Sequence, residues 1–366
     1  MDSAFLKSCG ITACFCLAAT TTLAADKQLN LYNWSDYIGK DTVANFAKET
    51  GTKVRYDVYD SEETLQTKLL TGSTGYDVVV PSSNFIGKQI EAGIYMPLDK
   101  TKLPNLANMD PHIMKVLEAF DPGNRYGVPW AWGTTGLAYN LTAVRKALGP
   151  DAPLDSWDIL FKPEYLSKLR GCGVSMLDSP ADVFAVALNY LGKDPNSRNP
   201  VDYQAAFETL KKVRPYIAQF SGFGYINDLA GGDVCFALSW SGDVMMASHR
   251  ATEAKKAFEL KYFIPKGGAP VWFDLMAIPK GAPHAEAAFE WMNYIMRPEV
   301  QAAITNEVFY PNANQAADKF VRAEIRSNPM IYPGDDVMKT LYPLKGLPPD
   351  IRRLENRMWA DLKSGR

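Results

Sequence analysis

A chain of 366 residues is too long for one compact hydrophobic core, so two domains are expected. Hydrophobic residues make up 47% of the chain and charged residues 22%, a composition typical of a soluble globular protein. The formal net charge of −2 argues against a nucleic-acid-binding protein, which needs a basic face, and gives no support for binding to an anionic membrane surface.

The first residues have the features of an export signal. Lys7 precedes an apolar stretch from Ile11 to Ala19, and small residues follow at Ala24-Ala25. We therefore predict a signal peptide over residues 1–25 and an exported protein. A lipoprotein anchor at Cys14 is the alternative. No later segment reaches the roughly 20 apolar residues that a membrane span needs.

Cysteine usage agrees with export. Cys9, Cys14 and Cys16 fall in the predicted signal, which leaves Cys172 and Cys235. An even remainder in an oxidising compartment predicts one disulfide that closes a long loop. The alternative is a pair of buried free thiols, since free cysteine is often buried.

The N-terminal part of the mature chain alternates between strand and helix patterns. Strands are predicted over 29–33, 53–59 and 76–80, and helices over 41–50, 60–70 and 85–92. This order indicates an α/β fold with an open parallel sheet. Ligands of such sheets bind outside the carboxyl ends of the strands. The loops Trp34-Ser35-Asp36 and Pro81-Ser82-Ser83 should therefore face one cleft.

The rest of the chain repeats this alternation and ends in helices. Strands are predicted over 173–177, 234–238, 260–264 and 272–278, and helices over 179–190, 244–258, 283–296, 298–305 and 348–363. Segments 133–136 and 261–265 have the features of crossings between two lobes. We expect discontinuous lobes, the first of residues 26–131 plus 254–306 and the second of residues 132–253 plus 307–366.

Three segments place a tryptophan close to an aspartate at or near a predicted strand end. They are Asn33-Trp34-Ser35-Asp36-Tyr37, Ser239-Trp240-Ser241-Gly242-Asp243 and Val271-Trp272-Phe273-Asp274. An aromatic face and a carboxylate both attract a cation, so together these segments would suit an organic amine. Trp157-Asp158 and Trp359-Ala360-Asp361 pair the same residue types, but they do not stand at strand carboxyl ends.

The acidic candidates differ in the structural role that each could have instead. Asp36 and Asp243 could begin the following turn or helix. Asp182 is the fourth residue of a capping-box pattern that begins at Ser179, and this spacing favours a structural role. Asp274 stands alone in an apolar strand, where a carboxylate costs several kcal/mol unless it is paired. Its partner is either an internal lysine or arginine or a ligand amine.

The other candidates also have structural alternatives. Trp34, Tyr37 and Tyr310 could pack in the core, and Ser82 is a common turn residue after proline. Because Trp34 and Tyr37 stand at the end of a predicted strand, a ligand role is as reasonable for them as packing.

No segment has the pattern of a catalytic, metal or cofactor site. His112, His249 and His284 are isolated, and the sequence has no His-Glu-x-x-His helix, phosphate-binding loop or Gly-x-Ser-x-Gly turn. We expect a binding protein without a cofactor. The alternative from another class is an exported hydrolase that uses Asp36, Asp182 or Asp274 as acid and base.

Five segments carry a family resemblance: Leu31-Tyr32-Asn33-Trp34-Ser35-Asp36-Tyr37-Ile38, Asp77-Val78-Val79-Val80-Pro81-Ser82, Tyr225-Ile226-Asn227-Asp228-Leu229-Ala230, Ser241-Gly242-Asp243 and Tyr310-Pro311-Asn312-Ala313-Asn314. In this order they resemble the periplasmic polyamine-binding proteins of ABC importers, and most closely the putrescine-binding members. The likeness runs from about Leu29 to Lys363-Ser364-Gly365. It implies a type II periplasmic binding-protein fold, in which two α/β lobes close on the ligand at a hinge.

The resemblance also implies roles for single residues. The aliphatic chain of the amine would lie between Trp34, Tyr37, Trp240, Trp272 and Tyr310, with Asp36 on the same wall. Ser35, Asp243 and Asp274 would hold one ammonium group, and Ser82 and Asp182 the other. Cys172 and Cys235 fall where putrescine receptors have a disulfide. The implied partners are a polyamine, an ABC permease and its ATPase, and the receptor would be a monomer.

Two residues depart from the putrescine-receptor pattern and leave the ligand length open. Asp182 stands where the family usually has Glu, and Trp272 stands where putrescine receptors tend to have Phe and spermidine receptors Trp. Ser179 and Asp243 follow the putrescine pattern. The resemblance therefore implies a putrescine receptor, with a spermidine-preferring receptor as the alternative. A type II receptor with a signalling role in place of transport is a further alternative.

Overall fold

The computed structural model describes residues 27–365. The predicted signal peptide, residues 1–25, and with it Cys9, Cys14 and Cys16, lies outside the described residues. In the part of the chain that is described, no helix is both long and apolar enough to cross a membrane.

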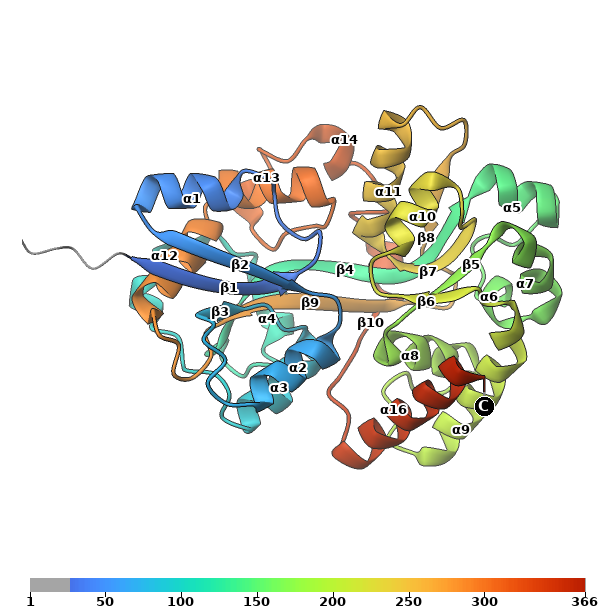
Figure 1. Ribbon diagram of the computed structural model, residues 1–366, viewed down its shortest axis with the longest axis horizontal. Helices are drawn as coiled ribbons and strands as arrows, with labels where there is room; N and C mark the ends of the chain where they lie inside the picture. Colours follow the sequence, from blue (N-terminus) through green and yellow to red (C-terminus); the bar gives the residue numbers. More distant parts are fainter. Residues whose placement is uncertain (1–26, 366) are drawn as a thin grey trace, which may run out of the picture.

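One half of the fold is built on the three N-terminal strands. β1 (Gln28–Trp34) lies between β2 (Lys53–Tyr59) and β3 (Val78–Val79) and runs parallel to both, which confirms the predicted parallel order. Helices cover both faces of this half (Figure 1). They are α1 (Thr42–Thr50), α2 (Glu62–Leu70), α3 (Ser83–Glu91), α4 (Pro111–Leu117), α12 (Ala285–Ile295) and α13 (Pro298–Val308).

The other half has the same construction. β5 (Val174–Leu177) lies between β6 (Gln219–Ser221) and β7 (Phe236–Trp240) and runs parallel to both. Its helices are α5 (Leu141–Leu148), α6 (Asp158–Phe161), α7 (Pro163–Leu169), α8 (Pro180–Tyr190), α9 (Pro200–Val213), α10 (Tyr225–Gly231), α11 (Ser241–Glu253) and α16 (Pro349–Ser364). The short helices α14 (Ala323–Arg326) and α15 (Asp335–Met338) precede α16 in the chain.

Two long strands connect the halves. β4 (Gly127–Asn140) pairs with β9 (Pro270–Ala277) along its first part and with β7 and β8 (Leu260–Phe263) along its second part, always antiparallel. β9 also pairs with β3 and with β10 (Tyr342–Pro343), so the sheet as a whole is mixed. Figure 1 shows β4 and β9 running through the middle of the molecule from one half to the other.

These pairings bear on two expectations from the sequence. The predicted crossing at residues 133–136 lies in the middle of one continuous strand, β4, where its partner changes from β9 to β7. The strands predicted over 260–264 and 272–278 are present, and each pairs with β4.

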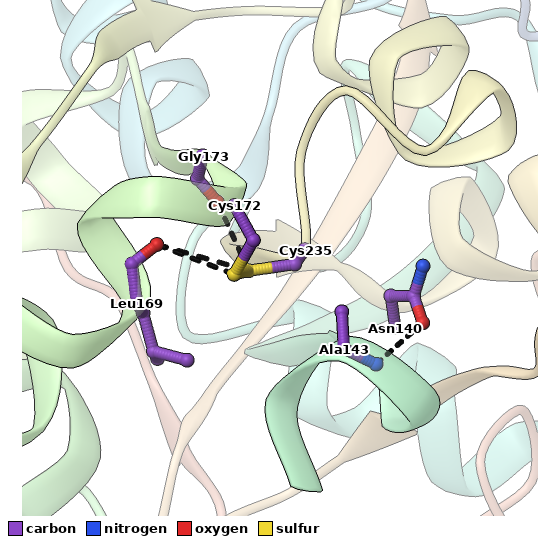
Figure 2. Close-up of a disulfide and its surroundings, with 6 residues drawn as sticks. All are labelled: Asn140, Ala143, Leu169, Cys172, Gly173 and Cys235. Carbon is purple, nitrogen blue, oxygen red and sulfur yellow. Dashed lines mark hydrogen bonds between the residues drawn. A yellow bond between two sulfur atoms is a disulfide. The ribbon is translucent and has the colours of Figure 1, made fainter. Parts of the chain in front are cut away.

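The predicted disulfide between Cys172 and Cys235 is confirmed (Figure 2). The two Cα atoms are 5.5 Å apart, and the residues are separated by 63 positions. Cys172 precedes β5 and Cys235 precedes β7, so the bond links the amino ends of two neighbouring parallel strands. The carboxyl ends of these strands carry Ser179 and Trp240, which belong to the site described next.

Candidate ligand-binding site

A cavity lies where the carboxyl ends of strands from both halves meet. It encloses about 650 Å³, counted out to its open mouth. This is the place where a ligand is expected in an open α/β sheet. Most of the residues predicted from sequence lie on its wall: Trp34, Tyr37, Ser82, Asp182, Trp240, Trp272, Asp274 and Tyr310.

The aromatic side chains on the wall form a continuous series. The ring centroid of Trp240 is 6.1 Å from that of Trp34 and 6.4 Å from that of Trp272. Tyr310 continues the series, at 5.5 Å from Trp272 and 5.0 Å from Tyr37. Such rings offer apolar surface to a methylene chain and a negative face to a cation.

Asp274 is the central carboxyl group of the cavity. It lies in β9, is 3% exposed, and accepts a hydrogen bond of 2.5 Å from the hydroxyl of Ser82. Burial raises the pKa of Asp274 to about 7, and the bond from Ser82 opposes that shift. The resemblance implies that Ser82 and Asp274 hold opposite ends of the ligand. That assignment is wrong, because the two side chains are directly bonded.

Asp243 lies behind the wall rather than on it. It is fully buried in the first turn of α11, and its two oxygens accept hydrogen bonds from the hydroxyls of Tyr225 and Tyr310. Burial raises the pKa of Asp243 to about 7, against the effect of these two bonds. Gly242 leaves room for the Tyr310 ring, since a Cβ there would come within 2.5 Å of it. Asp243 is therefore connected to the cavity wall through the hydroxyl of Tyr310.

Asp182 has the structural role that its spacing favours and also lies on the cavity wall. Ser179 is the N-cap of α8; its hydroxyl accepts from the Asp182 amide and donates to the Asp182 carboxylate at 2.7 Å. The other carboxylate oxygen accepts from the hydroxyl of Thr135. At 6% exposed, the side chain also lies on the cavity wall. Burial raises the pKa of Asp182, and both hydroxyls oppose the shift.

Ser35 and Asp36 do not lie on the wall. The hydroxyl of Ser35 donates to the backbone oxygen of Tyr59 at 3.3 Å. Asp36 has a positive φ of 52° and forms an ion pair with Arg250 at 3.2 Å. Its side chain is 45% exposed, and the structure does not place Asp36 on the wall that the resemblance implies for it.

The two tryptophan–aspartate pairs set aside from the sequence do not line this cavity. Neither Trp157 nor Trp359 lies on its wall. The indole nitrogen of Trp157 donates to the backbone oxygen of Gly268, and that of Trp359 donates to Asp178. These tryptophans have structural hydrogen bonds of their own.

Several wall residues were not predicted as ligand residues, and two of them are Glu62 and Phe223. Glu62 lies in the helix predicted over 60–70, although it follows the carboxyl end of β2 and so meets the criterion that selected Trp34. Phe223 lies 6.2 Å from Trp34 and 5.6 Å from Trp240, ring centroid to ring centroid. It has no acidic neighbour in the sequence, so the pairing pattern did not detect it.

Four buried carboxyl groups at the site lack a positive partner. Among the described residues, Glu62, Asp182, Asp243 and Asp274 are buried, and none forms an ion pair with a lysine, arginine or histidine. In the same part of the chain, no group of three or more potential ligands is arranged to hold a metal ion. The site therefore combines aromatic surface with buried acids that an organic cation could neutralise.

Known proteins with this architecture identify the family. The model for bacterial extracellular solute-binding proteins matches residues 41–331. The chain belongs to that family. It is 52% identical over 347 residues to the putrescine-binding periplasmic protein PotF of Escherichia coli (strain K12), with 94% of each chain covered. It is 50% identical over 350 residues to the putrescine-binding periplasmic protein SpuD of Pseudomonas aeruginosa (strain UCBPP-PA14), covering 96% of this chain and 95% of SpuD.

A solved structure supports the same family fold. The spermidine/putrescine ABC transporter substrate-binding protein PotD of Streptococcus pneumoniae strain Canada MDR_19A is similar with a TM-score of 0.74 and 28% sequence identity. The match covers 93% of this chain and 99% of the other. The resemblance to periplasmic polyamine-binding proteins and the expected two-lobe type II fold are both confirmed.

Proposed function

We propose that this protein is a periplasmic receptor that captures a polyamine, putrescine first, and delivers it to the permease of an ABC importer. The observation that carries the proposal is a cavity with aromatic walls and buried carboxyl groups that have no positive partner. A diamine supplies an apolar chain for the walls and two cations for the acids. The printed functions of PotF and SpuD support this choice.

The proposed roles follow the geometry of the cavity. The five predicted aromatic residues flank the methylene chain. Asp274 with Ser82 receives one ammonium group, and Asp182 the other, while Asp243 orients Tyr310. Ser35 and Asp36 support the wall from outside. A carboxylate–ammonium pair at 4 Å gains roughly 4 kcal/mol at an effective dielectric of about 20. Desolvation and ordering of both partners offset much of this gain.

In the cell, the protein would act as the exported receptor of an importer. The signal peptide over residues 1–25 directs export, and the mature monomer closes its two lobes on the amine. The permease is driven by an ATPase, and the receptor catalyses no reaction. The predicted lobe division stays a proposal, with one change. β8 and β7 pair with opposite edges of the same part of β4. We therefore now propose that residues 254–264 belong to the second lobe.

Two measurements test the proposed function. The first is mass spectrometry of small molecules released from the purified protein. The second is isothermal titration with putrescine, cadaverine and spermidine. We expect a released or tightly bound diamine. Absence of binding by every amine, or turnover of a glycoside or amide, would contradict the proposal.

A spermidine-preferring receptor is the second candidate. The observation in its favour is Trp272, a large ring at the centre of the aromatic series. If spermidine binds at least about tenfold more tightly than putrescine, roughly 1.4 kcal/mol, the second candidate replaces the first.

A further inference from the structure

Glu62 is a buried acid on the cavity wall whose role the proposed function does not include. It is the first residue of α2 and is 6% exposed. One carboxylate oxygen accepts from the backbone N–H of Ser82 at 3.1 Å. The other accepts from the side-chain amide of Gln89 at 3.4 Å, a long contact. Two neutral donors do not neutralise a buried carboxylate.

Ser82 connects Glu62 to Asp274. Its backbone N–H donates to Glu62 and its hydroxyl donates to Asp274, so the two carboxyl groups flank one residue. Glu62 interacts electrostatically with four ionisable groups: Asp274, Glu63, Tyr59 and Tyr95. All of them are acidic, and none supplies a positive charge.

The hydroxyl of Tyr37 lies beside the same pair. Tyr37 is 4% exposed and lies on the cavity wall, and within the described residues its hydroxyl makes no hydrogen bond of ordinary geometry. Burial, the charge of Asp274 and a hydrogen-bond interaction with that carboxylate raise the pKa of Tyr37 well above its usual value, so the hydroxyl lies near Asp274. A ligand ammonium could complete the bonding of the tyrosine oxygen.

We propose that Glu62 and Asp274, with Ser82 between them and Tyr37 beside them, form one subsite that takes a single primary ammonium group of the bound amine. This inference deepens the proposed function and rests on it. A primary ammonium carries three N–H donors, enough for both carboxylates and the tyrosine oxygen. One of these carboxylates alone would not accept from all three N–H donors.

The subsite links binding to proton release. Two buried carboxyl groups around one residue disfavour each other's ionisation, so without a cation the pair holds its protons more tightly than free carboxyl groups do. Burial raises the pKa of Asp274 to about 7 and that of Glu62 above its usual range. An entering ammonium replaces those protons, and they leave to solvent.

The test uses Glu62→Gln in the full mature chain, titrated with putrescine in two buffers of different ionisation enthalpy. The variant keeps the shape and the acceptor for Ser82, and it alters only the long contact to Gln89. We expect about tenfold weaker binding. We also expect about one proton fewer released per ligand, because one titrating group is gone. A purely structural role for Glu62 would weaken binding without changing the proton count.

The matched control is Glu324→Gln, the same chemical change at an exposed residue of α14. It should bind and release protons like the wild type. If the wild type binds putrescine near neutral pH without releasing any proton, the inference is overturned. This measurement needs no variant. A Glu62→Gln protein with unchanged affinity and proton count would also overturn the inference. If the wild type binds no amine at all, the proposed function itself fails.

Discussion

Two buried acids in different regions of the molecule differ in one respect. Glu355 in α16 is 1% exposed and bonds to Arg352 at 2.8 Å. Asp274 in the cavity is 3% exposed and bonds to the neutral hydroxyl of Ser82. Burial raises the pKa of both acids to about 7. Burial therefore does not tell a structural acid from a ligand acid, whereas the presence of a cation from the same chain does.

The largest expected effect is that of Asp274→Asn on amine affinity. We expect about 100-fold weaker putrescine binding, roughly 2.7 kcal/mol, because the ammonium loses its central carboxylate. The free energy of unfolding of the empty protein should not fall, since a neutral amide replaces a buried acid that has no cation. Titration calorimetry and thermal unfolding measure the two effects. A variant that binds within threefold of the wild type would remove Asp274 from the site.

Glu355→Gln should show the opposite pattern. It leaves Arg352, whose side chain is only 18% exposed, without its carboxylate. Removing one partner of a buried pair is costly, and we expect a loss of about 2 kcal/mol in the free energy of unfolding. Putrescine affinity should stay within about threefold of wild type. Chemical denaturation and titration calorimetry check this, and a loss of affinity equal to that of Asp274→Asn would break the comparison.

The pH dependence sharpens the comparison further. The pKa values of Asp243 and Asp274 are about 7 in the folded empty protein, above the usual value of 3.8. The stability that these groups contribute is thus fully present below about pH 4 and is lost as the pH rises through about 7. A bound cation favours the ionised form, so affinity should increase with pH.

We expect about a tenfold gain in putrescine affinity between about pH 6 and about pH 8, where the amine itself stays charged. Titration calorimetry across this range measures the gain. The slope should become smaller in Asp274→Asn and stay unchanged in Glu355→Gln. An affinity independent of pH would mean that the cavity acids are already ionised without ligand.

The fold was predictable where strands alternate with helices, but the long strand β4 was missed. All residues of β4 are buried, so it shows no alternation of polar and apolar residues. The segment with Gly133 and Gly136 indicated only a crossing between the lobes. In the structure these glycines permit close approach: a Cβ at Gly133 would come within 2.6 Å of the Trp272 ring, and one at Gly136 within 2.5 Å of a backbone oxygen.

The site was predictable only in part for a similar reason. Asp274 could be singled out because an acid in an apolar strand needs a partner. Its bond to Ser82 joins residues 192 positions apart, and no local pattern reports such a contact. The tyrosines that cover Asp243 are likewise distant in sequence. Neighbouring residues in the sequence therefore predict which acids belong to the site, but they do not predict the hydrogen-bond partners of those acids.

Trp272→Phe should have the smallest effect and concerns ligand length rather than charge. Within the described residues the indole nitrogen of Trp272 has no hydrogen-bond partner, so the exchange breaks no polar contact. A phenyl ring covers a shorter stretch of the amine, and the longer triamine loses more contact than the diamine. We expect the ratio of putrescine to spermidine affinity to rise about threefold, roughly 0.65 kcal/mol. Paired titrations measure that ratio. An unchanged ratio would mean that Trp272 contacts only the part of the cavity that both ligands occupy, and that length is read by the acids at its ends.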